Sequence, residues 1–211
     1  MQRFVLTENI ARFERLLSLE QDQGRRRTVV SLLASARREL VLFDAAESGL
    51  HAGPPLPGAR KVRPLEANPR LVLEFRDRFE NALTPALILD PGPGLLIIDI
   101  NARYARAAAT DRDRIAGRPL FELLPDNPDN PGADGVRNLF ASLRLAAQTR
   151  QPHRVERQRY DLRDSHGGFT ERYWHMVNTP VLADDGEPAC FLHQAEDVTA
   201  QVLAARGGRA N

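Results

Sequence analysis

The feature that most constrains the fold is the stretch from residue 169 to residue 199, which reads as two strands joined by a tight turn. Residues 169–182 are rich in aromatic and β-branched side chains, which favour strands. Residues 184–186 are Asp-Asp-Gly, and an Asp-Gly pair supplies the positive backbone φ angles that tight hairpin turns need. The apolar run 188–196 provides the second strand. We therefore predict a β-hairpin, with Pro180 favouring an edge or a bulge.

The predicted hairpin leads into a short helical exit. Asp197-Val198-Thr199 ends the second strand, and the side chain of Asp197 or Thr199 can cap a helix over residues 200–205. Only residues 200–211 follow, too few for a kinase, a cyclase or a DNA-binding segment. We therefore expect no catalytic effector and an output that passes to a partner.

Composition and charge argue against several classes of protein. The hydrophobic content of 42% supports a folded core, and a formal net charge of +1 gives no overall attraction to nucleic acid or anionic lipid. Cys190 is the only cysteine, so neither an intramolecular disulfide nor a cysteine metal cluster can form. No apolar run approaches the roughly 18 residues that span a bilayer, and the charged N-terminus is unlike a signal peptide. We expect a cytoplasmic protein that binds neither nucleic acid nor membrane.

Residues 1–48 are predicted to form a helical hairpin, because apolar residues recur there at helical spacing. Thr7 is the expected cap of the first helix, Gly24 interrupts the pattern, and the second helix runs from about residue 25 to 46. The arginines at 25–27 are interpreted as a solvated helix start rather than a phosphate site. Alone, such a hairpin cannot bury both apolar stripes, so we expect it to pack on a partner chain or on the later domain.

Residues 49–69 are rich in proline and glycine and predict a semi-rigid linker at a domain boundary. The remaining domain, residues 70–199, opens with a helical pattern over residues 70–82. Further predicted elements follow in order: strands at 86–90 and 95–99, short helices between 101 and 121, a helix at 134–149, a strand at about 153–163, and the hairpin. Residues 200–211 form the C-terminal helix and tail.

Several of these residues together resemble a PAS domain. Asn101 opens a helix three residues before Tyr104, Gly117-Arg118 forms a turn before a second short helix, and an Asp-Gly hairpin ends in Asp-Val-Thr. The resemblance covers most of residues 70–199. It implies an α+β fold: a PAS-like five-stranded antiparallel sheet with helices on one face, here preceded by the N-terminal hairpin. That hairpin is similar to helical segments that precede PAS domains in some alphaproteobacterial signalling proteins.

The resemblance also implies a ligand pocket on the inner face of the sheet. By likeness to flavin-binding light sensors, Gln194 points inward with Leu192 and Cys190, and His175 points inward with Tyr173 and Val177. Tyr160, His175 and Gln194 are then the candidate polar groups of a small-molecule pocket. In the same family, the exit at Asp197 and Thr199 passes conformational signals onward.

The outer face is the predicted interface. With the inner face set in this way, alternation points Trp174, Met176 and Phe191 outward, together with His193. Such an apolar patch needs a cover, either the N-terminal hairpin or another subunit. Phe75 and Phe79 on the entry helix would add to a homodimer contact.

Cofactor and catalytic chemistry lack support in the sequence. Light-sensing relatives need a cysteine in an Asn-Cys-Arg-Phe motif, which is absent, and Cys190 reads as a small core residue. Haem relatives use a histidine on the helix predicted here at 134–149, which has none, although His153 follows. We expect neither flavin nor haem and leave any cofactor open. His153, His166, His175 and His193 show no metal-ligand spacing, and Ser142 and Ser165 lack the context of a nucleophile.

The sequence thus predicts a bacterial, cytoplasmic PAS-domain signalling protein: a homodimeric sensory or protein-interaction module, with a signalling protein and a small-molecule ligand as its candidate partners. Two alternatives stay open. One is the sensor portion of a histidine kinase or a similar effector protein, and the other is a small-molecule enzyme built on a PAS-like fold.

Overall fold

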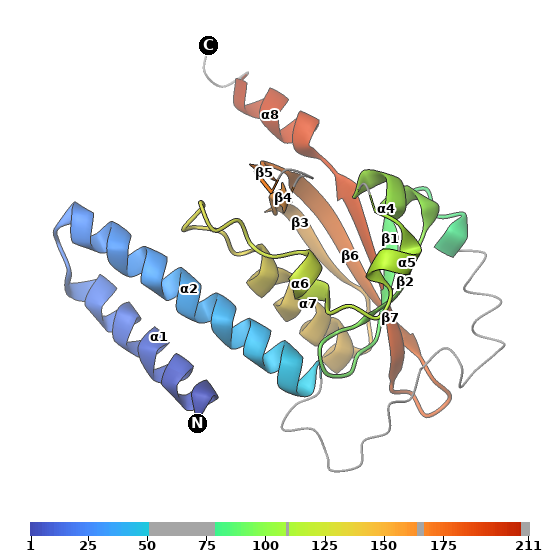
Figure 1. Ribbon diagram of the computed structural model, residues 1–211, viewed down its shortest axis with the longest axis horizontal. Coiled ribbons are helices and arrows are strands. Elements are labelled where there is room, and N and C mark those ends of the chain that lie inside the picture. The colour runs from blue at the N-terminus through green and yellow to red at the C-terminus, as the bar shows by residue number, and fades with distance from the viewer. Residues whose placement is uncertain (51–78, 109, 164–166, 208–211) are drawn as a thin grey trace.

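The computed structural model describes residues 1–50, 79–108, 110–163 and 167–207 (Figure 1). Its centre is an antiparallel sheet with the strand order β2-β1-β7-β6-β3. Its strands are β1 (Ala86–Leu89), β2 (Ile97–Ile100), β3 (His153–Arg159), β6 (Tyr173–Leu182) and β7 (Pro188–Asp197). The predicted fold class is confirmed: a PAS-like five-stranded sheet preceded by an α-helical hairpin.

The predicted strand 153–163 and the first strand of the predicted hairpin are each split. Their ends form a separate small sheet of β4 (Leu162–Arg163) and β5 (Phe169–Thr170). The pairing of β3 with β6 shifts register before Gln158, and Arg157 adopts a φ of 52°, so a bulge bends the strand there. Periodicity alone does not locate such a bend.

Helix α7 (Gly135–Thr149) covers one face of the sheet, as predicted. Three short helices complete the cover: α4 (Ala102–Ala107), α5 (Arg112–Ile115) and α6 (Leu120–Leu123). The main core lies between these helices and the sheet. Its fully buried members from the strands and α7 include Leu87, Leu89, Ile97, Ile100, Leu139, Leu143 and Phe191.

Asn101 and Gly117 adopt the roles expected of them. The Asn101 side-chain oxygen accepts the Tyr104 N–H at 2.8 Å, which caps α4, and also the Ala86 N–H at 3.1 Å, which ties the helix start to β1. Asn101 is completely buried, so both contacts are shielded from water. Gly117 has a φ of 78°, in the left-handed region.

The N-terminal hairpin consists of α1 (Gln2–Leu19) and α2 (Gln23–Ser48). The predicted cap Thr7 is wrong: it lies inside α1, where its hydroxyl donates to the Arg3 carbonyl at 2.9 Å. The interruption also falls before Gly24, because Asp22 caps α2 by accepting the Arg25 N–H at 2.8 Å. The arginines at 25–27 form an exposed helix start, as interpreted.

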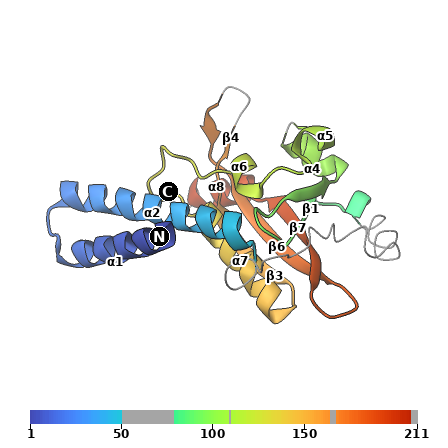
Figure 2. The same cartoon turned by 60° about the horizontal axis from the view of Figure 1, so that its bottom comes forward.

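The hairpin packs against the domain that holds the sheet (Figures 1 and 2). Helix α2 runs beside α7, and its C-terminal end rests on the turn between β1 and β2. There the Ala45 carbonyl accepts the Gly94 N–H at 2.5 Å, and Leu50 N–H donates to the Pro91 carbonyl at 2.9 Å. Val41, Ala45 and Leu50 belong to the main core. One of the two expected packing modes, docking on the later domain, is therefore present.

Gly49 makes this close contact possible. Its φ is 58°, and a Cβ atom built there would lie 2.1 Å from the Gly92 carbonyl oxygen. The remaining linker, and the entry helix before Phe79 with Phe75, lie outside the described residues. Within the described ranges, no helix has the length and apolar character to cross a membrane.

Candidate functional site

The two faces of the sheet are opposite to the prediction. Trp174, Met176 and Phe191 lie in the main core under α7, with exposed fractions of 8%, 2% and 0%. They are not an outward patch. Cys190 and Leu192 pack instead on the other face, in a smaller cluster with Phe79, which is itself 1% exposed. Strand side chains alternate, so a one-residue error in placing Gln194 inverts every assignment.

The three predicted pocket residues are therefore not brought together. Tyr160 lies in the main core, where its hydroxyl donates to the Leu124 carbonyl and its own carbonyl accepts the Trp174 indole N–H at 2.8 Å. His175 and Gln194 lie on the opposite face, and Gln194 donates to the Thr84 hydroxyl at 3.1 Å. A single pocket that contains all three is not formed.

A different group of polar side chains occupies the inner face. His193 on β7, Asn178 on β6 and His153 on β3 are directly opposite one another across the three strands. Ser142 reaches this row from α7 above it. The row is deeply enclosed, since Asn178, Ser142 and His193 are 0%, 2% and 3% exposed. We call these four residues the polar row.

A continuous chain of hydrogen bonds links the polar row. His193 Nδ1 lies 2.8 Å from Asn178 Oδ1, Asn178 Nδ2 donates to Ser142 Oγ at 2.7 Å, and Ser142 Oγ lies 2.8 Å from His153 Nδ1. As the amide of Asn178 is assigned, Oδ1 only accepts, so His193 carries its proton on Nδ1. The Ser142 hydroxyl is then free to donate to His153. The chain joins the covering helix to three strands of the sheet.

Burial decides the charge of His193. Removal from water lowers its pKa to about 4, so the imidazole is neutral at pH 7. A neutral, hydrogen-bonded histidine suits the apolar surroundings provided by Leu87 on the neighbouring strand. His153 is only half-buried and forms the outer end of the chain. The polar row thus connects the centre of the core to a position near the surface.

A second buried polar group lies where α7 begins. Asp126 Oδ1 accepts the Val136 N–H at 3.0 Å, which anchors the first turn of the helix. Burial raises the pKa of Asp126, while the Val136 N–H and the positive charge of Arg38 on α2 act against this rise. Nearby, the Tyr160 ring packs so closely on Gly135 that a Cβ there would lie 2.4 Å from the ring. The start of α7 is therefore sensitive to both the hairpin and the sheet.

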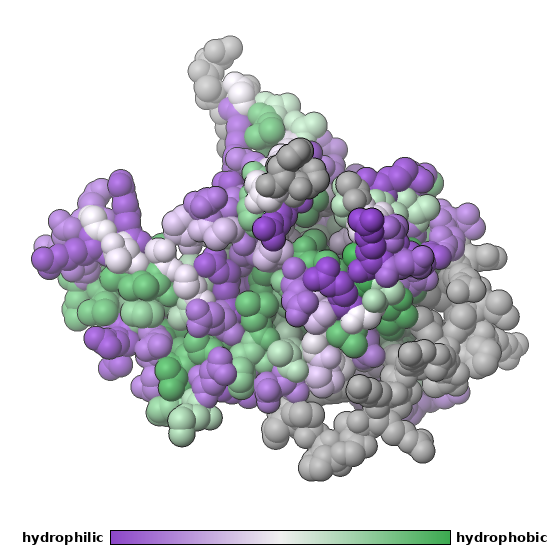
Figure 3. Space-filling model, in the orientation of Figure 1, coloured by the Kyte–Doolittle hydropathy of each residue, from purple (hydrophilic) through white to green (hydrophobic). Residues whose placement is uncertain are grey.

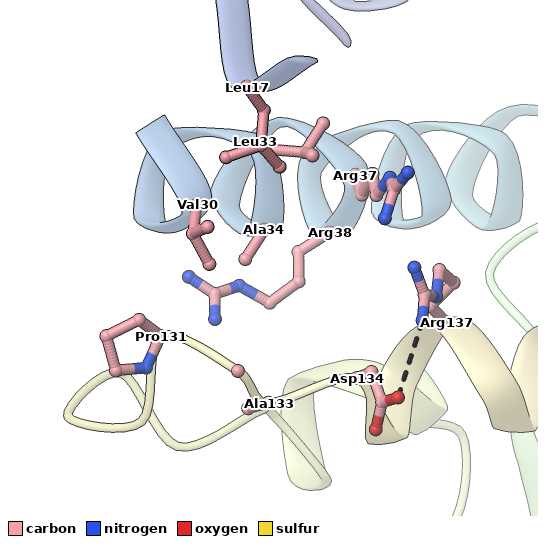
Figure 4. Close-up of a pocket in the computed structure, with 11 residues that line it drawn as sticks. Leu17, Val30, Leu33, Ala34, Arg37, Arg38, Pro131, Ala133, Asp134 and Arg137 are labelled. Carbon is pink, nitrogen blue, oxygen red and sulfur yellow. Dashed lines mark hydrogen bonds and ion pairs between the residues drawn. The ribbon is translucent and has the colours of Figure 1, made fainter. Parts of the chain in front are cut away.

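A cavity of about 230 Å³ separates the hairpin from the loop before α7 (Figure 4). The Arg38 side chain extends from α2 toward the loop that carries Pro131, over apolar walls that include Val30. Two other guanidinium groups at the cavity are paired: Arg37 with Glu14 at 2.6 Å and Arg137 with Asp134 at 3.4 Å. The cavity lies outside the inner face, so it is separate from the polar row.

The predicted exit residues fasten the end of the sheet to the last helix. The Asp197 carboxylate accepts the Thr199 N–H at 2.9 Å, and the Thr199 hydroxyl accepts the Tyr173 N–H at 2.9 Å. Helix α8 (Thr199–Gly207) begins there and projects away from the sheet (Figure 1). Arg206 on α8 lies over the Tyr173 ring, 4.9 Å from its centre. Strands β6 and β7 are thereby joined to α8.

Sequence reasoning missed the polar row, although signals for it were present. Trp174, Met176 and Phe191 form the larger apolar set of the hairpin, which is the usual mark of a core face. Taking that set as inward would have placed His193 and Asn178 inward too. The contribution of Ser142 depends on how α7 crosses the sheet, which no local pattern in the sequence specifies.

A family model described as a PAS fold matches residues 79–203, more than half of the chain. Among curated proteins, none matches in sequence.

Solved structures give likenesses of low identity. The Rhodobacter sphaeroides LOV protein is 14% identical, with a TM-score of 0.49 over 62% of this chain and 68% of that one. The PAS domain of a Colwellia psychrerythraea protein is 13% identical, with a TM-score of 0.47 over 62% and 98%. An RNA-binding light-oxygen-voltage receptor is 16% identical, with a TM-score of 0.47 over 70% of this chain but 37% of its own.

Proposed function

This chain belongs to the PAS fold family, and on that premise we propose that it is a sensory and protein-interaction module of a bacterial signalling system. In this proposal it acts in the cytoplasm as a homodimer. A change in the core alters the position or stability of α8, and a signalling partner binds that helix and responds to the change.

One observation carries the proposal: the polar row and the exit share the same two strands. His193 and Asp197 both lie on β7, the middle strand, while Asn178 and Tyr173 both lie on β6. A rearrangement of the polar row strains these strands, and the Tyr173–Thr199 hydrogen bond passes that strain to α8. Such a connected arrangement is what a signal needs in order to travel from core to surface.

Hydrogen exchange tests this coupling. The variant Ser142→Ala cuts the polar row between α7 and the sheet without adding bulk. We expect faster amide exchange not only in α7 and β3 but also in residues 198–207. The variant Thr199→Val should speed exchange in α8 while leaving α7 as in the wild type.

Thr149→Ala is the matched control, because Thr149 lies on the same helix but its hydroxyl makes only local hydrogen bonds, to the Leu145 carbonyl and from the Gln151 N–H. It should leave exchange in α8 unchanged. If Ser142→Ala loosens α7 and β3 while α8 exchanges at the wild-type rate, the core and the exit are uncoupled and the proposed route of signalling is wrong.

A further inference from the structure

Helix α1 has an apolar face that the other described residues of the chain do not cover. Its inner side packs toward α2 through the buried Leu6, but the opposite side keeps large hydrophobic residues in water. These are Met1, Phe4, Val5, Leu16 and Leu19, with exposed fractions of 106%, 68%, 49%, 43% and 78%. Hydrophobic side chains also show as green over the hairpin in the space-filling view (Figure 3). Concentrated on one helix, such exposure marks an interaction surface.

The exposed residues follow a regular spacing. Positions 1, 5, 8, 12, 16 and 19 are separated by three or four residues, so they form one stripe along an α-helix. The two ends of the stripe are apolar, and its middle consists of Glu8 and Arg12. Neither of these two forms an ion pair with any described residue of the chain. We call this stripe, together with Phe4 and Arg15 beside it, the α1 face.

The α1 face is complementary to itself when it is turned around. In an antiparallel pair related by a two-fold axis near residue 10, residues whose numbers add up to about 20 meet. Met1 then meets Leu19, and Val5 meets Leu16. Glu8 meets Arg12 twice, once on each side of the axis. A parallel arrangement would instead place like charges opposite each other.

We propose that the α1 face binds the α1 face of a second copy of this chain, in antiparallel orientation, to form a four-helix contact from two hairpins. This inference deepens the homodimeric part of the proposed function and rests on that part alone. It replaces the sheet surface that the sequence suggested, since Trp174, Met176 and Phe191 are already buried within one chain. Four-helix packing is a common way to bury a second stripe on a helical hairpin.

The local chemistry supports a second copy rather than an unrelated partner. Apolar residues at both ends of the stripe bury one another symmetrically, and the opposite charges at its centre fix the register. Phe4 also comes beside Arg15 of the other copy, which allows a cation–π contact. Arg3 and Glu14 flank the stripe but are held within the chain by Asp44 and Arg37, so they do not compete for Glu8 or Arg12.

Charge-reversal variants of the full chain test this inference, with the dissociation constant of the dimer measured by sedimentation equilibrium. Glu8→Arg places four positive charges around the two-fold axis, and Arg12→Glu places four negative ones. We expect each single variant to weaken dimerisation at least tenfold. The combined variant Glu8→Arg/Arg12→Glu should restore the dissociation constant to within about threefold of the wild type, because opposite charges face each other again.

Two further variants separate the α1 face from general effects. Leu19→Gln should weaken the dimer, whereas Leu42→Gln, at a side chain 43% exposed on α2, should not. Unchanged circular dichroism would show that α1 stays helical. A wild-type monomer would overturn both the inference and the homodimeric part of the proposed function. A dimer that is equally strong in all variants would overturn this inference alone and leave coupling to α8 untouched.

Discussion

At the scale of single residues, the buried His193 couples protonation to folding. Its folded-state pKa of about 4 is below the unfolded value of 6.5, so between these values the unfolded chain binds more protons. The stabilisation from neutral His193 is complete above pH 6.5 and is lost as the pH falls toward 4. The full shift corresponds to on the order of 3 kcal/mol of unfolding free energy.

Urea unfolding at several pH values measures this effect. Since carboxylates also titrate in acid, the informative quantity is the difference between the wild type and His193→Gln, whose amide still donates to Asn178. We expect the variant to lose less stability between pH 6.5 and 4. His175→Gln, on the other face of the sheet, should follow the wild type. If the unfolding free energies of the wild type and His193→Gln fall equally between pH 6.5 and 4, burial does not lower the pKa of His193 as assigned.

The thiol of Cys190 should be inert in the native protein. Burial, with a smaller contribution from Asp90, raises its pKa to about 12, and the side chain is 2% exposed. Only the thiolate reacts, so an aromatic disulfide reagent at pH 8 should label Cys190 no faster than the chain unfolds. A second thiol introduced by Leu83→Cys, at a side chain 82% exposed, should react at once. Rapid labelling of Cys190 in the wild type would show that the outer-face cluster opens readily.

At the scale of elements, the packing of the C-terminal end of α2 against the β1–β2 turn depends on Gly49. The substitution Gly49→Ala adds a Cβ where the Gly92 carbonyl leaves no room, at a backbone conformation that other residues avoid. We expect a loss of about 3 kcal/mol of unfolding free energy, measured by chemical denaturation.

Gly186→Ala is the matched control for Gly49→Ala. Gly186 has a φ of 80°, but nothing lies within 4 Å of a Cβ built there. The substitution therefore has the cost of an unfavourable backbone conformation but no clash, and we expect a loss of about 1 kcal/mol of unfolding free energy. Equal losses in the two variants would mean that the contact between α2 and the β1–β2 turn adds nothing to stability.

The elements also show how far the sequence could lead. The Asp-Gly turn, the Asn101 cap, the Gly117 turn and the bounds of α7 were all predictable, because each depends on residues close together in the chain. The bulge at Arg157 was not predictable, since it depends on how β3 pairs with β6. The same holds for the separation of β4 and β5 from the main sheet. The faces of β6 and β7 were assigned wrongly because a resemblance, displaced by one residue, was preferred to the apolar pattern of Trp174, Met176 and Phe191.

At the scale of the whole molecule, the candidate site was less predictable than the fold. Ser142 and His153 are 11 residues apart along the chain. Asn178 follows Ser142 by 36 residues, and His193 follows Asn178 by another 15. Only the strand order and the crossing of α7 bring the four together. The hairpin, by contrast, was expected to pack on either the later domain or a partner chain. Its α2 does the first, and the α1 face offers a surface for the second.

The position of α2 in the core has a practical consequence for anyone who recombines sensory domains. The family match begins at residue 79, yet Val41, Ala45 and Leu50 lie in the same hydrophobic core as the sheet. A chimaeric receptor joined at residue 79 would lack these three side chains, so the part of the core beside the β1–β2 turn would be exposed to water. A transferable domain therefore has to include the helical hairpin. The structural unit is larger than the segment that matches the family in sequence.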